Sequence, residues 1–204
     1  MLKVGLTGSI AVGKSFVLGI LAELGCRVLN ADVTAREVVA PESPGLQAAV
    51  DAFGKEILLP DGGLDRAKLG SLIFADEQKR LRLNSILHPF IIAKQDEQMR
   101  KWESEDPKGI AVIDAALMIE SGGYRRFDKL IVVHCRSEVQ LQRSMSRDGL
   151  SRQEAEQRIA AQMPQEEKKK FADFLIDTSD GFESAREQTK AVYQQLREPD
   201  EAGC

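Results

Sequence analysis

Short apolar runs alternate along this chain with longer segments in which apolar and polar residues mix at helical spacing. The apolar runs lie at residues 2–6, 27–30, 110–113, 129–133 and 174–176. Runs of this length favour buried parallel strands. The helical pattern covers residues 16–24, 34–39, most of 45–105 and 182–196. Strands that alternate with helices predict an α/β fold in which right-handed crossovers wind a parallel sheet.

Prolines mark several of the expected helix boundaries. Pro41 and Pro44 are expected to end the helix that begins near Thr34. His88-Pro89 predicts a boundary further along the chain, with Pro89 in the first turn of a new helix. The stretch between these points is expected to be mainly helical.

Residues 8–15 read Gly-Ser-Ile-Ala-Val-Gly-Lys-Ser, a complete G-x-x-x-x-G-K-[ST] phosphate-binding loop between the first expected strand and helix. Glycine lets such a loop approach phosphates closely, and backbone N–H groups and the helix N-terminus bind them. We expect Lys14 to reach the β- and γ-phosphates and the Ser15 hydroxyl to bind Mg²⁺. The nucleotide-binding residues expected here are Gly8, Ala11, Val12, Gly13, Lys14, Ser15 and Phe16. A glycine-rich turn with an incidental lysine is the alternative, and the strand–loop–helix context disfavours it.

Composition narrows the function classes. A net charge of −4 argues against a broad nucleic-acid-binding surface. The longest apolar candidate for a membrane span, Ile110–Ile119, is too short and is interrupted by Asp114. Cys26, Cys135 and Cys204 lack the spacing of a zinc site or a disulfide framework. We therefore expect a cytoplasmic protein with reduced thiols and no membrane or nucleic-acid partner, and a monomer by default.

Two aspartates follow expected strands, where a parallel sheet binds its ligands. Asp32 comes just after the strand at 27–30, and Asp114 follows the strand at 110–113. Phosphoryl transfer needs a base beside the acceptor hydroxyl, and Asp32 is suited to that role. The alternative is that Asp32 only caps the next helix. The chain lacks the Asn-Lys-x-Asp guanine reader of a GTPase.

Arginines follow the strand at 129–133. Arg143 and Arg147 are four residues apart, which places both on one face of an expected helix. Guanidinium groups suit phosphate oxygens and stabilise the charge that develops in phosphoryl transfer. A solvated charged helix is the alternative. The run Lys168-Lys169-Lys170 is expected to be ordinary surface.

Further motifs carry a resemblance that spans the chain from Leu2 to about Gly181. They are Leu24-Gly25 to Ala31-Asp32, Phe53 to Leu58, Asp61 to Arg66, Leu83 to Pro89, Gln140 to Arg143, Arg147 to Ser151 and Arg158 to Gln162. In this order they resemble the dephospho-coenzyme A kinase family. The phosphate loop is common to many families, whereas F-G, L-D-R, L-N-x-x-x-H-P and R-D-x-L-S in sequence are far more discriminating.

The resemblance implies the ATP-dependent phosphorylation of the ribose 3′-hydroxyl of dephospho-CoA, the last step of coenzyme A synthesis. It implies ATP as donor, Mg²⁺ as the metal and dephospho-CoA as acceptor. It also implies a P-loop kinase fold in one domain. The implied parts are a core (1–32, 108–140 and 171–197), a helical acceptor lobe (about 33–107) and a helical lid (about 141–170).

The resemblance also assigns roles to single residues. Asp32 becomes the general base, and the catalytic residues are Asp32, Lys14 and Arg147. Arg143 and Arg147 become lid residues that contact ATP. The acceptor-pocket candidates are Arg66, His88 and Glu120. Asp114 becomes a candidate to hold Mg²⁺ through water, together with Ser15; for both Asp114 and His88 a structural role is the alternative.

Three departures from the family pattern stand in the sequence. Ser9 and Ala11 occupy positions where the loop usually has glycine, although the motif-defining glycines remain. Asn30 replaces the first carboxylate of the usual D-A-D, and Ala116 replaces the proline of P-L-L-F-E. Another small-molecule kinase, a nucleotide-dependent switch and an inactive relative remain alternatives.

Overall fold

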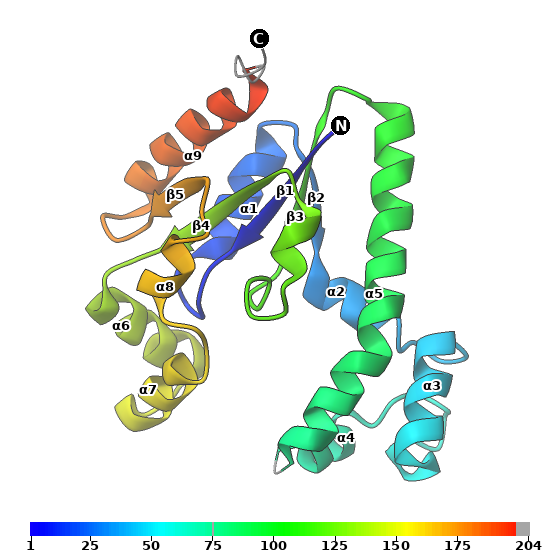
Figure 1. The fold of residues 1–204 in the computed structure, drawn as a ribbon. Helices are drawn as coiled ribbons and strands as arrows, with labels where there is room; N and C mark the ends of the chain where they lie inside the picture. The colour runs from blue at the N-terminus through cyan, green and yellow to red at the C-terminus, as the bar shows by residue number, and fades with distance from the viewer. Residues whose placement is uncertain (75, 199–204) are drawn as a thin grey trace. The chain divides into compact units, whose positions relative to one another are not determined.

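Among the residues that the structure describes, 1–74 and 76–198, five strands form one sheet in this computed structural model (Figure 1). The strands are β1 (Leu2–Thr7), β2 (Arg27–Asn30), β3 (Ile110–Asp114), β4 (Lys129–His134) and β5 (Phe174–Asp177). Their order across the sheet is β2-β3-β1-β4-β5. The β1–β3, β1–β4 and β4–β5 pairs are parallel. The predicted parallel sheet is confirmed, and so is each predicted strand.

Helices occupy most of the remaining chain. They are α1 (Lys14–Glu23), α2 (Ala31–Glu37), α3 (Pro44–Phe53), α4 (Arg66–Phe74), α5 (Glu77–Glu105), α6 (Ser137–Asp148), α7 (Arg152–Ala160), α8 (Gln165–Lys169) and α9 (Phe182–Arg197). Short 3₁₀ helices cover Lys55–Ile57 and Gly123–Arg126. The mainly helical character of 45–105 and the final helix are confirmed. In the described residues no helix is both long and apolar enough to span a membrane.

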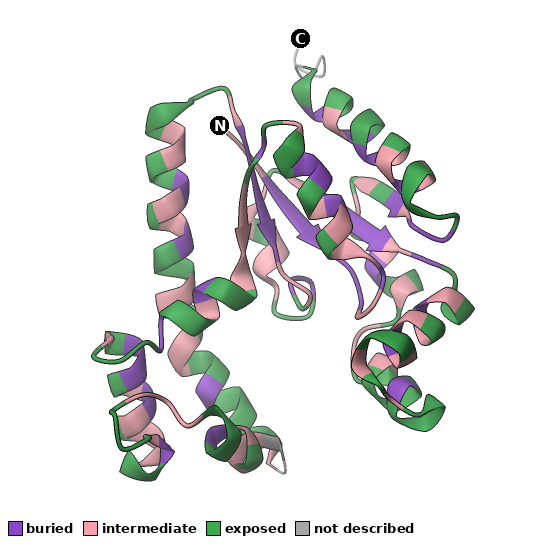
Figure 2. Ribbon diagram, turned by 180° about the vertical axis from the view of Figure 1, so that it is seen from behind, coloured by how far each residue is buried: buried purple, intermediate pink, exposed green. Residues whose placement is uncertain are grey.

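The core of the sheet is built by apolar residues from strands and two helices. Figure 2 shows buried residues concentrated along the strands and on the inner faces of the helices that cover them. Val17 and Leu21 of α1 are one helical turn apart, as are Val192 and Leu196 of α9, and all four pack in one cluster with the strands. Burial of such side chains contributes roughly 1.5–3 kcal/mol each. This packing fixes the ends of β1, β3 and β4, where the polar site residues lie.

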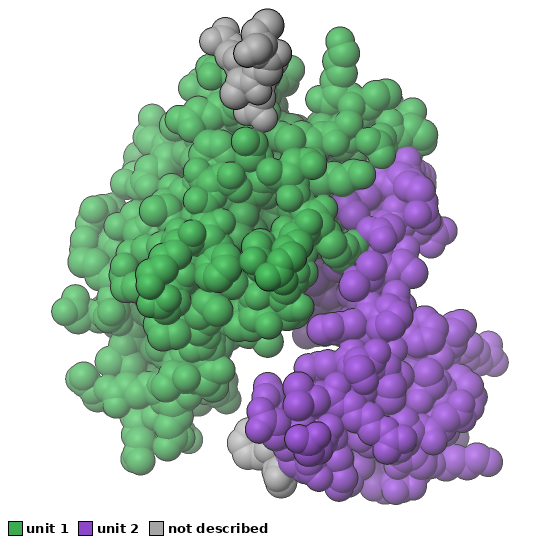
Figure 3. All heavy atoms as spheres, in the orientation of Figure 1, with its two compact units in different colours: residues 1–29, 102–204 green, residues 30–101 purple. Residues whose placement is uncertain are grey.

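The chain divides into two compact units, drawn in different colours in Figure 3. The first contains residues 1–29 and 102–204 and holds most of the sheet with α1 and α6–α9. The second contains residues 30–101 and has apolar clusters of its own. These clusters contain Ala49, Ile57, Leu69 and Leu83, and Val38, Val39 and Leu46. The boundaries expected for core, acceptor lobe and lid stay predictions.

α2 ends at Glu37, before Pro41 and Pro44 as predicted, and Pro44 then occupies the first turn of α3, where its missing N–H is not needed. The boundary predicted at His88 is wrong. Pro89 lies inside α5, which runs through the expected boundary at His88 and bends along its length (Figure 1). Proline removes one helical hydrogen bond, and a bend is its usual consequence. Leu87 and Phe90 flank the proline and pack against buried apolar residues, so tertiary packing retains the helix.

The cysteines agree with the expectation of reduced thiols as far as the structure describes them. Cys26 and Cys135 are free and buried, whereas Cys204 lies outside the described residues. Burial raises the pKa of the Cys26 thiol to about 11, and burial also raises the pKa of Cys135. Both thiols are thus kept protonated and unreactive at neutral pH.

Candidate active site at the carboxyl ends of the strands

The phosphate-binding loop joins β1 to α1, as its sequence predicts. Gly8 passes so close to β4 that a Cβ would lie 2.4 Å from the Val133 carbonyl oxygen, which excludes any side chain. Gly13 has φ +87° and precedes α1 without a side-chain cap. The N-terminus of α1 is therefore left open to an anion, with its N–H groups and its dipole directed at the loop.

Lys14 and Asp114 form an ion pair at the floor of this site. The Lys14 ammonium contacts Asp114 Oδ1, and Asp114 is 1% exposed. Parallel pairing of β1 with β3 sets Asp114 beside Leu6, directly before the loop, and so brings the two charges together. A buried carboxylate is stable there because it is paired. The same ammonium would also reach phosphates held by the loop.

Thr178, which the sequence did not single out, links the loop to Arg143. The Thr178 hydroxyl donates to the Val12 carbonyl at 2.7 Å. Arg143 of α6 donates to the Thr178 hydroxyl and carbonyl, both at 2.8 Å. Gly13 lies against this group, since a Cβ on it would be 3.4 Å from Thr178 Oγ1 and 3.6 Å from an Arg143 nitrogen. The predicted loop residue and the predicted lid arginine therefore lie together.

Arg147 also lies on α6, but its guanidinium is engaged with a neighbour. It binds both carboxylate oxygens of Asp148, at 2.8 and 2.9 Å, and Arg158 approaches the same carboxylate at 3.4 Å. The hydrogen bond from Arg147 lowers the pKa of Asp148 and raises that of Arg147. Arg147 remains exposed, so its contact with ATP stays a prediction.

Aromatic residues extend the surface beside the loop. Phe16, in the first turn of α1, packs against Phe182 of α9 with ring centroids 4.7 Å apart. Phe182 is 71% exposed, and Arg186 lies 5.9 Å from the Phe16 ring centroid. The expected nucleotide-binding residue Phe16 thus has aromatic and cationic neighbours.

Glu120 is bound by α8 and by the loop that precedes it. Lys168 Nζ lies 2.8 and 3.1 Å from its two oxygens and donates to the Ala116 carbonyl at 2.7 Å. The Met163 N–H also donates to Glu120, at 3.2 Å. Lys168 is completely buried, so the expectation that residues 168–170 are ordinary surface is wrong for it. The sequence hid this role because a lysine between two other lysines gives no sign of burial. A role for Glu120 in the acceptor pocket stays a prediction.

Asp32 is not the cap of its helix. The Asn30 side chain caps α2 and accepts hydrogen bonds from the N–H groups of Asp32 and Val33, at 2.8 and 3.2 Å. The capping alternative is therefore wrong, because the departure from the family pattern at Asn30 fills that role. Asp32 is exposed in the first turn of α2, and no hydrogen bond of its carboxylate occurs within the described part of the chain. Its catalytic role stays a prediction.

The other acceptor candidates lie in the second unit. Arg66 begins α4, is exposed and donates weakly to the Arg36 carbonyl at 3.4 Å. His88 is an exposed residue in the middle of α5, so its alternative role at a helix start is wrong. Contact of either residue with the acceptor stays a prediction.

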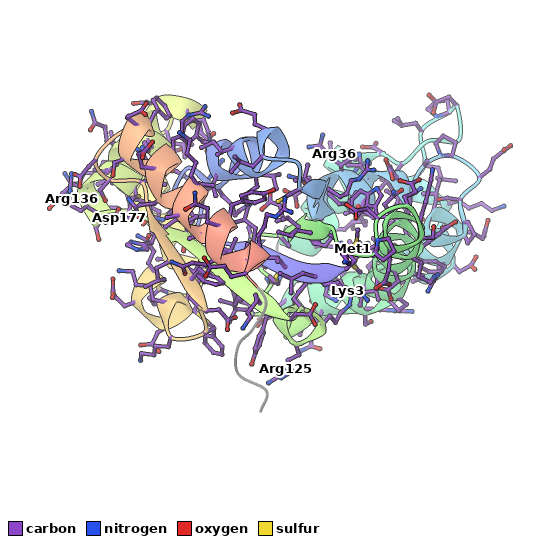
Figure 4. The ribbon with its side chains drawn as sticks, turned by 90° about the horizontal axis from the view of Figure 1, so that it is seen from above. Met1, Lys3, Arg36, Arg125, Arg136 and Asp177 are labelled. Atoms are coloured by element: carbon purple, nitrogen blue, oxygen red, sulfur yellow. The ribbon has the colours of Figure 1, made fainter. Side chains whose placement is uncertain are left out.

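A cavity of about 400 Å³ opens beside the carboxyl end of β4, lined in part by His134, Lys169 and Asp177. Arg136 and Asp177 lie at the same corner of the molecule (Figure 4). Burial, and then the Lys169 charge, lower the pKa of His134. For Asp177, burial acts to raise the pKa, but two hydrogen bonds from Ser179 outweigh it and the pKa falls. The cavity therefore favours a neutral imidazole beside an ionised carboxylate.

Metal-binding chemistry at the loop fits Mg²⁺ that arrives with a nucleotide. Oxygen donors come from Ser15, in the first turn of α1, and from Asp114, the last residue of β3. Within the described residues no group of three or more His, Cys, Asp or Glu side chains could hold a metal alone. Mg²⁺ typically takes one or two protein oxygens together with substrate phosphates and water.

Comparison with known proteins identifies the family of the chain. A sequence model of the dephospho-CoA kinase family matches residues 2–184. A dephospho-CoA kinase of Carboxydothermus hydrogenoformans is 44% identical over 194 residues, which cover 95% of this chain and 94% of that protein. A dephospho-CoA kinase of Geobacter metallireducens is 43% identical over 195 residues, 96% of each chain.

Solved structures share the fold. A dephospho-CoA kinase from Campylobacter jejuni matches with a TM-score of 0.64 and 30% identity, over 95% of this chain and 96% of that one. A Thermus thermophilus protein matches with a TM-score of 0.81 and 29% identity, over 96% of this chain and 97% of that one. A shikimate kinase from Acinetobacter baumannii, at 18% identity and a TM-score of 0.53, shares the fold alone. The predicted P-loop kinase fold and kinase class are confirmed. The chain belongs to the dephospho-CoA kinase family, whose members catalyse the ATP-dependent phosphorylation of dephospho-CoA, the final step of coenzyme A biosynthesis.

Proposed function

We propose that this chain transfers the γ-phosphoryl group of ATP directly to the ribose 3′-hydroxyl of dephospho-CoA, without a phosphoenzyme. The observation that carries the proposal is a complete phosphate loop with Lys14 and Asp114 at the strand ends, in a chain that matches the family over residues 2–184. Asp32, Lys14 and Arg147 are the catalytic residues, and Arg143 supports the loop that holds the donor.

Lys14 changes partners when the donor binds. The phosphates that enter the loop compete with Asp114 for the Lys14 ammonium, which then neutralises charge on the β- and γ-phosphates. The loop N–H groups and the N-terminus of α1 hold the remaining oxygens. Arg147 leaves Asp148 to contact the transferring group, since its pairing with Asp148 is exposed and weak.

Asp32 acts on the acceptor. Its carboxylate orients the 3′-hydroxyl and takes its proton as the new P–O bond forms. Arg66, His88 and Glu120 bind the acceptor. Ser15, and Asp114 through water, would hold Mg²⁺, which would supply charge neutralisation at the phosphates. A monomeric state and a cytoplasmic location complete the proposal.

Acceptor-dependent ADP release tests this function. Purified protein is assayed with ATP and Mg²⁺, with dephospho-CoA or with a panel that contains nucleoside monophosphates and shikimate. We expect ADP to form stoichiometrically with coenzyme A and only with dephospho-CoA. Slow ADP formation that needs no acceptor would indicate a nucleotide-dependent switch, and ADP formation with another acceptor would indicate a different kinase. A Lys14→Ala variant controls for contaminating kinases and is expected to lack the activity.

A further inference from the structure

The phosphate loop contains an alanine in a conformation that favours glycine. Ala11 has φ +61°, in the left-handed region. Among the described residues other than glycine, only Ala11 and Glu42 have positive φ. A Cβ in this region crowds the backbone, so the conformation is less stable for alanine than for glycine. Something else must therefore hold the loop in this shape.

Both backbone polar groups of the preceding residue, Ile10, are held by glutamine side chains. The Ile10 N–H donates to Gln162 Oε1 at 2.8 Å. The Ile10 carbonyl accepts from Gln140 Nε2 at 2.9 Å. Gln140 lies on α6 and Gln162 between α7 and α8, so the two contacts come from separate parts of the chain. Together the two hydrogen bonds fix the backbone of Ile10, the residue directly before Ala11.

The orientation of Gln140 is itself determined. Its Oε1 accepts from Gln165 Nε2 at 2.8 Å, and Gln165 Oε1 accepts from the Cys135 N–H at 3.0 Å. Gln140 is 2% exposed, so each of its polar atoms needs a protein partner. With Oε1 bound to Gln165, only the amide nitrogen can face Ile10. The network thus presents a fixed donor to the loop.

We propose that Gln162 and Gln140 are positioning residues that hold the backbone N–H and carbonyl of Ile10, and with them the left-handed Ala11, in the form that binds nucleotide phosphates. The ligand class is the phosphate chain of a nucleoside di- or triphosphate. Both glutamines belong to the α6–α8 region, and they set the donor affinity of the loop without themselves contacting the donor. The role of these contacts in the reaction rests on the proposed function, whereas their effect on nucleotide binding can be tested without it.

Mg-ADP binding, measured by calorimetry, tests the inference directly. Gln162→Met removes the acceptor but keeps the length of the side chain, which is only half-buried. We expect Mg-ADP affinity to fall about tenfold, the effect of one hydrogen bond of about 1.4 kcal/mol. Gln162→Asn, whose shorter amide should not reach Ile10, is expected to behave alike. Gln157→Met on the exposed face of α7 is the matched control and should bind as wild type.

The Ala11→Gly background separates positioning from a general effect on folding. Glycine adopts the left-handed conformation without crowding, so the hydrogen bonds from Gln140 and Gln162 to Ile10 should matter less in this background. We expect Gln162→Met to weaken Mg-ADP binding less than about threefold in this background. An equal loss in both backgrounds, or wild-type affinity of Gln162→Met, would overturn the inference. Failure of the proposed function looks different: Mg-ADP binds and responds as expected, but dephospho-CoA is not phosphorylated.

Discussion

At the scale of single residues, two aspartates at strand ends have contrasting surroundings. Asp114 is buried, and its Oδ1 contacts Lys14. This carboxylate oxygen is therefore not available to a substrate hydroxyl. Asp32 is exposed, and in the described part of the chain its carboxylate makes no hydrogen bond because Asn30 caps the helix instead. Because the cap comes from residue 30, the Asp32 carboxylate is free for an acceptor hydroxyl.

Asp32→Asn tests the role of this carboxylate. Asparagine has nearly the same size but cannot accept a proton, so we expect kcat to fall at least about 10²-fold. The KM for ATP should change little, because the donor is held by the loop. Steady-state kinetics with dephospho-CoA measure both constants. Asp51→Asn, at an exposed position of α3, serves as the control; a kcat for Asp32→Asn close to that of this control would reject Asp32 as the base.

At the scale of elements, α8 carries two neighbouring lysines with opposite environments. Lys168 is fully buried between Glu120 and the Ala116 carbonyl, whereas Lys169 pairs with Glu166 at the surface. Lys168→Met keeps the volume of the side chain but leaves Glu120 without its cation. Since Glu120 is 23% exposed and retains the Met163 N–H, we expect a loss of about 2–3 kcal/mol in the free energy of unfolding. This corresponds to a fall of roughly 4–12 °C in Tm.

Lys169→Met is the matched control for this prediction. Lys169 pairs with Glu166, whose side chain is exposed to solvent. Loss of this ion pair should therefore change the free energy of unfolding by less than about 1 kcal/mol. Thermal unfolding of both variants at pH 8 makes the comparison. Equal Tm values for the two variants would show that Lys168 does not anchor α8.

Helices and strands also show which features follow from local sequence and which depend on distant residues. Short apolar runs located each strand, and the phosphate-loop motif located α1, because both signals depend on neighbouring residues. Pro89 was placed at a boundary because the local cost of proline is visible in the sequence, whereas the apolar packing of α5 that offsets it is not. Lys168 and Gln162 owe their roles to partners 48 and 152 residues away. Such pairings follow from the folded arrangement of helices, which no local pattern contains.

At the scale of the molecule, the predicted site residues belong to two units that have separate apolar clusters. The first unit carries the loop, Asp114, Glu120 and the α6 arginines, and the second carries Asp32, Arg66 and His88. The resemblance to a family was needed to connect them, because composition and spacing assign no acceptor to the second unit. The residues proposed to bind the donor could thus be chosen largely from the sequence, whereas those proposed to bind the acceptor could be chosen only by analogy, and both sets stay predictions.

The stability of the whole protein should depend on pH through His134. Burial and the Lys169 charge lower its pKa in the folded state, against the opposing charges of Asp177 and Glu166. The unfolded chain, with an ordinary histidine pKa of about 6.5, then binds more protons below that pH than the folded chain does. Stability is therefore expected to decline as the pH falls from 7.5 to 5.5, and His134→Gln should reduce this decline. Urea unfolding at several pH values measures the effect.

Lys169→Met separates the causes of the low His134 pKa. Removing the lysine leaves burial as the cause that disfavours the imidazolium, and it leaves Asp177 and Glu166 to favour it. The folded-state pKa should then move back toward its ordinary value, so the variant should lose less stability than wild type between pH 7.5 and 5.5. His134→Gln and Lys169→Met should have non-additive effects on the slope, since both act on one titration. A decline as steep in His134→Gln as in wild type would place the pH dependence in other groups.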